Sequence, residues 1–212
     1  VFEQAPELSE VGAGLTVTPN ATKGLIYLGL GQAMEKIGMA HDLQGVRHYQ
    51  TKEMIVPLKR GKHMLEKYAA YQFQVHRADI HDILIEDLEK NSPGCIFVDH
   101  QLIDVDQRSD KVKLIFKNQA EHEFDFVIGA DGTRSTVRQS ILETDEPEFS
   151  GYVAWRGIVP TDGLDASDFD ECGSSAFISP GRVFARYLIR GAKEYNYVAF
   201  LATEEWAEEG WS

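Results

Sequence analysis

Two stretches near the start of the chain carry apolar residues at a helical spacing. Pro19 suits the first turn of a helix over residues 19–28, whose apolar side chains fall on one face. Residues 29–38 predict a turn and a second short helix that ends near Gly38.

The clearest helical pattern covers residues 77–90. Its apolar residues recur every four positions, at Ile80, Leu84 and Leu88, with Ile83 beside them. Asp79 in the first turn and Lys90 in the last turn both suit the helix dipole. We therefore expect one amphipathic helix here.

Shorter apolar runs bounded by turn residues predict strands. Residues 46–58 alternate loosely, and further strands are expected at 95–99, 102–106, 111–116 and 123–129. A helix is expected at 134–142. After residue 150 the strand-like runs continue with little helix between them, which predicts a second, sheet-rich domain.

Composition narrows the class of protein. The 212 residues are 43% hydrophobic, enough for a packed core, and the formal net charge is −13. This acidic balance argues against nucleic acid or an anionic membrane as the main partner. The chain contains no apolar run of the roughly 18 residues that a membrane span needs.

Cysteine and histidine spacing gives no sign of a metal site or a nucleophile. Cys95 and Cys172 form no CxxC pair, which favours a reducing, cytoplasmic setting. The seven histidines show no HExxH pattern, and no GxSxG motif occurs. We expect no metal and assign no catalytic residue. Because the chain starts without Met, in what reads as the end of a strand, we expect a piece of a longer protein.

Three stretches allow a ligand-binding interpretation beside a structural one. Glu3 follows two apolar residues, where a dinucleotide-binding unit places the acid that accepts from a ribose, although a surface glutamate looks the same. The glycines of "VGAG" at 11–14 permit a close backbone approach to a ligand, or simply a turn. Arg77 stands at the helix end that the dipole disfavours, so either a bound phosphate or mere solvent exposure explains it.

The most patterned stretch is "FDFVIGADGTRSTVR" at 124–138. Phe124, Phe126, Val127 and Ile128 predict a buried strand that ends at Gly-Ala-Asp-Gly. Asp131 then lies where ligands bind in open α/β sheets. The alternative is that Asp131 only caps the helix that follows.

Taken in order and at their intervals, "EQAPELSEVGAGLTVTPNA", "HRADIHDIL", "VIGADGTRSTVR" and "GYVAWRGIVP" resemble the FAD-dependent aromatic-ring hydroxylases, in particular the branch of salicylate hydroxylase and 6-hydroxynicotinate monooxygenase. The resemblance covers nearly the whole chain and is thin after about residue 160. The family's GxGxxG motif would lie before Val1 and its GD motif after Ser212.

The resemblance implies a set of site residues. Asp131 matches the acid of the second dinucleotide signature, which is associated with FAD and NAD(P)H. The other residues matched to cofactor contacts are Glu3, Gln4, Thr16, Arg77 and Leu102. Tyr187 matches a tyrosine of the substrate pocket, with a half-buried sheet tyrosine as the alternative. Trp155 and Arg156 either approach the flavin or pack at the domain boundary.

The expected fold is α/β: a Rossmann-like FAD-binding domain over 1–149 that lacks its first βα unit, followed by a partial, sheet-rich α+β substrate domain over 150–212. Residues 46–60 are candidates for the second sheet. The resemblance implies a monooxygenase that uses FAD, NAD(P)H and O₂ to hydroxylate a small aromatic acid or phenol. A flavin oxidoreductase without hydroxylation and a non-catalytic nucleotide-binding module stay open as alternatives.

Overall fold

The computed structural model describes residues 1–9, 12–107, 110–142, 147–165 and 172–204. These residues form two compact units. The first unit contains residues 1–9 and 87–150, and the second contains residues 10–86 and 151–212.

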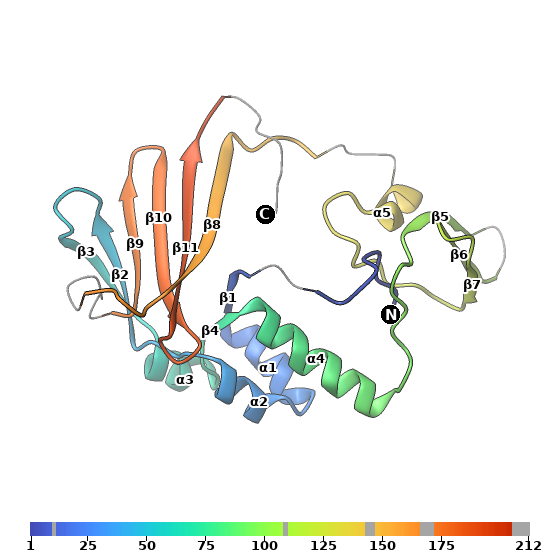
Figure 1. The fold of residues 1–212 in the computed structure, drawn as a ribbon, viewed down its shortest axis with the longest axis horizontal. Coiled ribbons are helices and arrows are strands. Elements are labelled where there is room, and N and C mark those ends of the chain that lie inside the picture. The colour runs from blue at the N-terminus through green and yellow to red at the C-terminus, as the bar shows by residue number, and fades with distance from the viewer. Residues whose placement is uncertain (10–11, 108–109, 143–146, 166–171, 205–212) are drawn as a thin grey trace. The chain divides into compact units, whose positions relative to one another are not determined.

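The second unit is built on a six-stranded sheet in the order β3-β2-β9-β10-β11-β8 (Figure 1). All neighbours in this sheet are antiparallel except β2 and β9, which run parallel. The strands are β2 (Leu43–His48), β3 (Met54–Lys59), β8 (Tyr152–Pro160), β9 (Ser174–Ser179), β10 (Arg182–Ile189) and β11 (Glu194–Ala202).

A second layer packs on this sheet. It is a two-stranded antiparallel pair with helices beside it, formed by β1 (Gly14–Val17), α1 (Pro19–Tyr27), α2 (Gly31–Ile37), α3 (Gly61–Tyr68), β4 (Phe73–His76) and the first part of α4 (Arg77–Asn91). Its core contains Val17, Met34, Phe73 and Val75, with Ile80 and Ile83 of α4 packed against them. The amide of Gln74 donates to the Ser174 hydroxyl over 3.1 Å and joins this layer to the sheet.

The first unit holds a three-stranded antiparallel sheet, β5 (Leu102–Asp106), β6 (Val112–Phe116) and β7 (Glu121–Phe124), followed by helix α5 (Thr136–Ile141). Phe2 forms a single parallel bridge with Phe97. The Phe2 ring lies 5.2 Å from that of Phe97 and 4.7 Å from that of Phe116. This aromatic cluster anchors the first residues of the chain to the sheet.

Most of the predicted elements are confirmed. The helices expected at 19–28, 29–38, 77–90 and 134–142 are present, as are the strands at 102–106 and 111–116 and the sheet after residue 150. The run 46–58 contains two strands, β2 and β3, and both lie in the same sheet as the strands after residue 150. The functional division into a FAD-binding and a substrate domain stays a prediction.

Two predicted strands are wrong. The run 95–99 makes only the isolated bridge at Phe97. The strand expected over 123–129 ends at Phe124, and Phe126 and Ile128 are 75% and 83% exposed. An apolar run becomes a buried strand only when a neighbouring strand and a covering layer are available. Among the described residues, nothing pairs with 125–130 in a ladder.

No helix in the described part of the chain is long and apolar enough to cross a membrane.

One ion pair ties helix α4 to the end of β10, inside the second unit. The Arg190 guanidinium donates to the Asp79 carboxylate through Nε, over 3.0 Å to Oδ2, and through Nη2, over 2.5 Å to Oδ1. Arg190 also pairs with Glu194 over 3.2 Å. The hydrogen bonds from Arg190 hold the pKa of Asp79 below its usual value, although partial burial opposes this.

We predict that Asp79→Asn lowers the free energy of unfolding by about 1 kcal/mol, because partly exposed ion pairs contribute little more than this. A carboxyl whose pKa is lower in the folded protein stabilises above its unfolded pKa and loses the effect as pH falls. The difference between wild type and variant, measured by denaturant unfolding, should therefore shrink below about pH 4. Asp82→Asn, on the exposed side of the same helix, is the control. An equal loss in both variants would contradict the prediction.

Candidate functional site

The face of the six-stranded sheet that β1 approaches carries the polar residues of the candidate site. Tyr187 on β10 and Asn196 on β11 are directly paired. Arg156 on β8 follows the same alternation and lies close enough for its charge to act on the Tyr187 hydroxyl. Tyr187 is half-buried, and Asn196 is 1% exposed.

Strand β1 approaches this face at Gly14. The Gly14 N–H donates to the Asn196 Oδ1 over 2.7 Å. A Cβ atom at position 14 would lie 2.5 Å from the Asn196 Cγ and 2.7 Å from the Tyr187 Oη. Only glycine therefore allows this separation. The close backbone approach expected of "VGAG" is thus made at Gly14, toward the six-stranded sheet. Val11 of that motif lies outside the described residues.

Two of the predicted site residues meet here. The Thr16 hydroxyl lies near enough to the Tyr187 hydroxyl to lower the pKa of the phenol by hydrogen bonding. Burial raises the pKa of Tyr187 to about 12, although the Thr16 hydrogen bond and the Arg156 charge both act to lower it. The phenol is therefore protonated at neutral pH, so it can donate or accept a hydrogen bond but is no general base.

Arg77 lies at the start of α4, exposed, with its backbone N–H donating to the Ala13 carbonyl over 2.8 Å. The next free N–H of the helix, from Ala78, donates to the His76 Nδ1 over 3.1 Å. Burial lowers the pKa of His76, and the positive charge of Arg190 lowers it further, against the acids around it. The neutral imidazole of His76 thus accepts a hydrogen bond from a backbone N–H in the first turn of α4.

The remaining predicted residues belong to the first unit. Glu3 is half-buried at the Phe2–Phe97 bridge, and its Oε1 accepts from the Ala5 N–H over 2.8 Å. Gln4 beside it is exposed. Leu102 begins β5, and its carbonyl accepts from the Thr136 hydroxyl over 3.5 Å.

Asp131 organises the start of helix α5. One carboxylate oxygen accepts from the Ser135 hydroxyl, and the other accepts from the Val137 N–H over 3.1 Å. Ser135, the N-cap residue, accepts from the Arg138 N–H over 2.9 Å. Burial acts to raise the pKa of Asp131, but the hydrogen bonds together bring it below its usual value. The side-chain contacts of Asp131 are therefore those of a residue that caps helix α5.

Gly129 and Gly132 flank the Ala130-Asp131 pair, and each position favours glycine for a different structural reason. A Cβ at Gly129 would lie 2.7 Å from the Val137 Cβ, so glycine lets the loop pack on α5. Gly132 has φ +80°, the left-handed region that glycine tolerates best, and a Cβ there would meet nothing within 4 Å. The backbone at Gly132 is therefore open on the side where a side chain would stand.

The structure thus brings Thr16 together with Tyr187, and it joins Leu102 to the loop that Asp131 shapes. Sequence reasoning missed Asn196. Its signal was a lone amide in the apolar strand "EYNYVAFLA", because a polar residue buried in such a run needs a hydrogen-bond partner. No cluster of three or more His, Cys, Asp and Glu side chains suited to a metal ion occurs in the described ranges.

We predict that Gly14→Ala destabilises the protein by about 1–3 kcal/mol, because the added methyl forces β1 away from Asn196 and Tyr187. Gly24→Ala in α1 is the matched control, since a Cβ there meets nothing within 4 Å and a helical alanine should stabilise by about 0.5–1 kcal/mol. Denaturant midpoints measure both. A Gly14→Ala protein as stable as wild type would refute the close approach.

We also predict that Asp131→Ala opens the first turn of α5. The amide of Val137 loses its acceptor, so its hydrogen exchange should accelerate about fivefold, as expected for losing roughly 1 kcal/mol of capping. Exchange measured by NMR or mass spectrometry tests this. Asp110→Ala, an exposed acid of the same unit, should leave exchange in α5 unchanged. Unaltered protection in Asp131→Ala would show that the cap contributes nothing.

Comparison with known proteins finds relatives over nearly the whole chain. The chain is 33% identical over 210 residues to 6-hydroxynicotinate 3-monooxygenase of Pseudomonas fluorescens, and 32% identical over 199 residues to 3-amino-4-hydroxybenzoate 2-monooxygenase of Streptomyces cremeus. These alignments cover 97% and 94% of this chain and 53% and 49% of the relatives. The chain thus spans about half the length of the curated relatives it matches.

The same fold occurs in Klebsiella pneumoniae HpxO, whose crystal structure contains FAD and uric acid. The TM-score is 0.83 at 21% identity, and the match covers 98% of this chain and 51% of the other. The family model described as "FAD binding domain" matches residues 1–207. Its match, the relatives and the fold agree with the resemblance seen in the motifs, and the chain belongs to the FAD binding domain family.

Proposed function

We propose that the intact protein is an FAD-dependent monooxygenase that hydroxylates a small aromatic acid or phenol with NAD(P)H and O₂. Membership of the FAD-binding family supports the cofactor, and the matched relatives are aromatic monooxygenases by name. The observation in this structure that carries the proposal is that β1 approaches the six-stranded sheet at Tyr187 and Asn196, which brings Thr16 near the Tyr187 hydroxyl.

The residues present fit FAD. The half-buried Glu3 carboxylate has the acceptor chemistry that a ribose needs, and the open backbone at Gly132 allows a phosphate to approach. Both oxygens of Asp131 are engaged within its own loop, so we assign it to shaping that loop. Gln4, Leu102, Thr16 and Arg77 complete the proposed cofactor contacts. When bound, the flavin supplies the redox chemistry with O₂.

Tyr187 is the proposed substrate residue. Its phenol stays protonated near neutral pH and can donate a hydrogen bond to a ring oxygen of the substrate. Such a bond favours the electron-rich, phenolate-like ring that hydroxylation requires. Arg156 adds a positive charge on the same side, which suits an anionic substrate.

The decisive experiment uses the purified intact protein. A bound flavin spectrum, NADH oxidation stimulated by 6-hydroxynicotinate, 3-amino-4-hydroxybenzoate or 3-hydroxybenzoate, and an O₂-dependent hydroxylated product together support the proposal. Stimulated oxidation without hydroxylated product would favour an oxidoreductase of another kind. A colourless protein that takes up no FAD would exclude both enzyme interpretations.

We predict that Tyr187→Phe lowers the turnover number for hydroxylation by about 10- to 100-fold, because a hydrogen bond to a charged group contributes roughly 1.5–3 kcal/mol. FAD content should not change. Because the pKa of Tyr187 lies at about 12, the shape of the rate profile near neutral pH should be the same in both proteins. Tyr27→Phe, on the exposed face of α1, is the control. Full activity in Tyr187→Phe would remove the residue from the mechanism.

We further propose a cytoplasmic location. Cys95 and Cys172, the two cysteines of the chain, form no disulfide with each other, which fits a reducing compartment.

A further inference from the structure

The six-stranded sheet carries a pocket on the face opposite Tyr187. Side chains alternate along a strand, so Arg182, Phe184 and Arg186 of β10 point away from the face that carries Tyr187. Their cross-strand partners extend this second face, with Ala199 on β11 and Phe177 on β9 paired to Phe184. The pocket has a volume of about 590 Å³, within the range of small-molecule sites.

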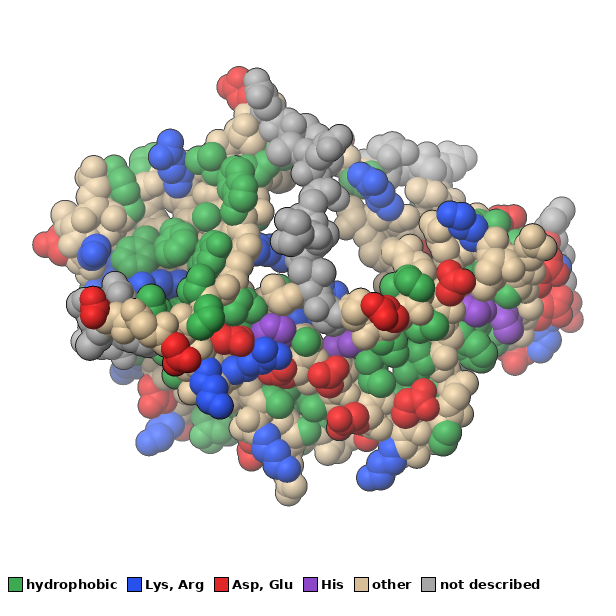
Figure 2. Space-filling model, in the orientation of Figure 1, with side chains coloured by type: hydrophobic (Ala, Val, Ile, Leu, Met, Phe, Trp, Pro, Cys, Tyr) green, Lys and Arg blue, Asp and Glu red, His purple; other side chains and the backbone are tan. Residues whose placement is uncertain are grey.

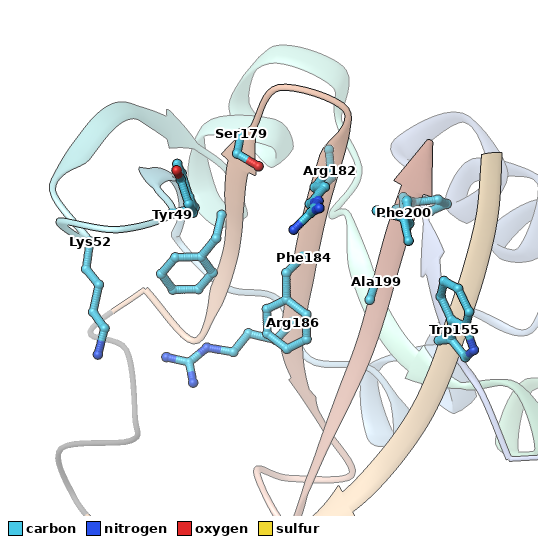
Figure 3. Close-up of a pocket in the computed structure, with 12 residues that line it drawn as sticks. Tyr49, Lys52, Trp155, Ser179, Arg182, Phe184, Arg186, Ala199 and Phe200 are labelled. Atoms are coloured by element: carbon cyan, nitrogen blue, oxygen red, sulfur yellow. The ribbon is translucent and has the colours of Figure 1, made fainter. Parts of the chain in front are cut away.

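Aromatic rings and cations line this pocket together. Its main side chains are Tyr49, Lys52, Trp155, Phe177, Phe184 and Arg186, with Arg182 at the rim. Figure 3 shows Arg182 and Arg186 around Phe184, with Lys52 at one side and Trp155 at the other. Trp155 is 55% exposed, and Figure 2 shows apolar side chains gathered on this part of the sheet beside blue ones.

The Arg186 guanidinium is held by aromatic rings. Its central carbon lies 5.4 Å from the centre of the Phe177 ring and 5.3 Å from that of the Tyr195 ring. Its Nε is buried and has no hydrogen-bond partner in the described structure. The two rings therefore hold the guanidinium in place while one of its donors stays unsatisfied, an arrangement that suits a carboxylate.

Within the described residues, no ion pair neutralises the positive charge of the pocket. Within the described ranges, Lys52, Arg182 and Arg186 form no salt bridge, and none of the lining residues is acidic. The chain as a whole has a net charge of −13. Three cations that pair with no acid in the described part of so acidic a protein create a local site for an anion.

We propose that this pocket binds a planar aromatic anion, an aryl carboxylate, at a site distinct from the Tyr187 face. The rings of Trp155, Phe177 and Phe184 supply stacking surface, and Arg182, Arg186 and Lys52 supply the charge. The proposed binding goes beyond the hydroxylation proposed above and needs no flavin turnover. A failure of either proposal is therefore visible without the other.

The test is calorimetric titration of the intact protein with 2-naphthoate and with the neutral analogue 2-naphthalenemethanol. Wild type should bind 2-naphthoate at least about tenfold more tightly than the alcohol, since the cations contribute charge-assisted hydrogen bonds. Arg182→Gln, an exposed residue, should weaken naphthoate binding about tenfold without disturbing the fold. Arg186→Lys keeps the charge but loses the planar fork, and it should also weaken binding.

Two further variants locate the ligand. Lys23→Gln, an exposed cation on α1, and Tyr187→Phe should both keep the wild-type naphthoate affinity of the pocket. If Arg186→Lys does not fold, as judged by circular dichroism, Arg182→Gln decides alone. No naphthoate binding by wild type, unchanged affinity in Arg182→Gln, equal affinity for the alcohol, or loss of binding in Tyr187→Phe alone would each overturn the proposal.

Discussion

The second unit depends on how closely β1 can approach the large sheet. At Gly14 the separation leaves no room for a Cβ, and the backbone N–H reaches the Asn196 amide directly. This contact brings Thr16 within hydrogen-bonding reach of Tyr187. A larger residue at position 14 would separate the two layers and the two hydroxyl groups together. Packing at one glycine therefore decides the geometry of the candidate substrate site.

The alternation of side chains gives the sheet two chemically different faces. One face carries Tyr187, Asn196 and Arg156 toward β1, and the Asn196 Oδ1 there accepts from the Gly14 N–H. The opposite face carries Arg186, which lies over two aromatic rings, and surrounds an open pocket. Successive side chains of a strand point to opposite faces of the sheet, so a single strand such as β10 contributes residues to both faces.

Asp131 shapes the loop in which it lies, and both of its carboxylate oxygens are used for that. Its carboxylate accepts from Ser135 and Val137 and so fixes the start of α5. Gly132 leaves the adjacent backbone open. An acid with both oxygens occupied is a poor direct neighbour for a pyrophosphate, because like charges repel. The loop backbone is better suited to that contact.

Local spacing in the sequence determined the helices at 19–28 and 77–90, because helical periodicity is a short-range signal. The ordered motifs likewise pointed to the family, which the match over residues 1–207 confirms. Only the tertiary structure decided that β2 and β3 join the strands after residue 150, and that Phe126 and Ile128 stay exposed. Strand pairing and burial depend on partners far along the chain. The meeting of Thr16 with Tyr187, 171 residues apart in sequence, has the same cause.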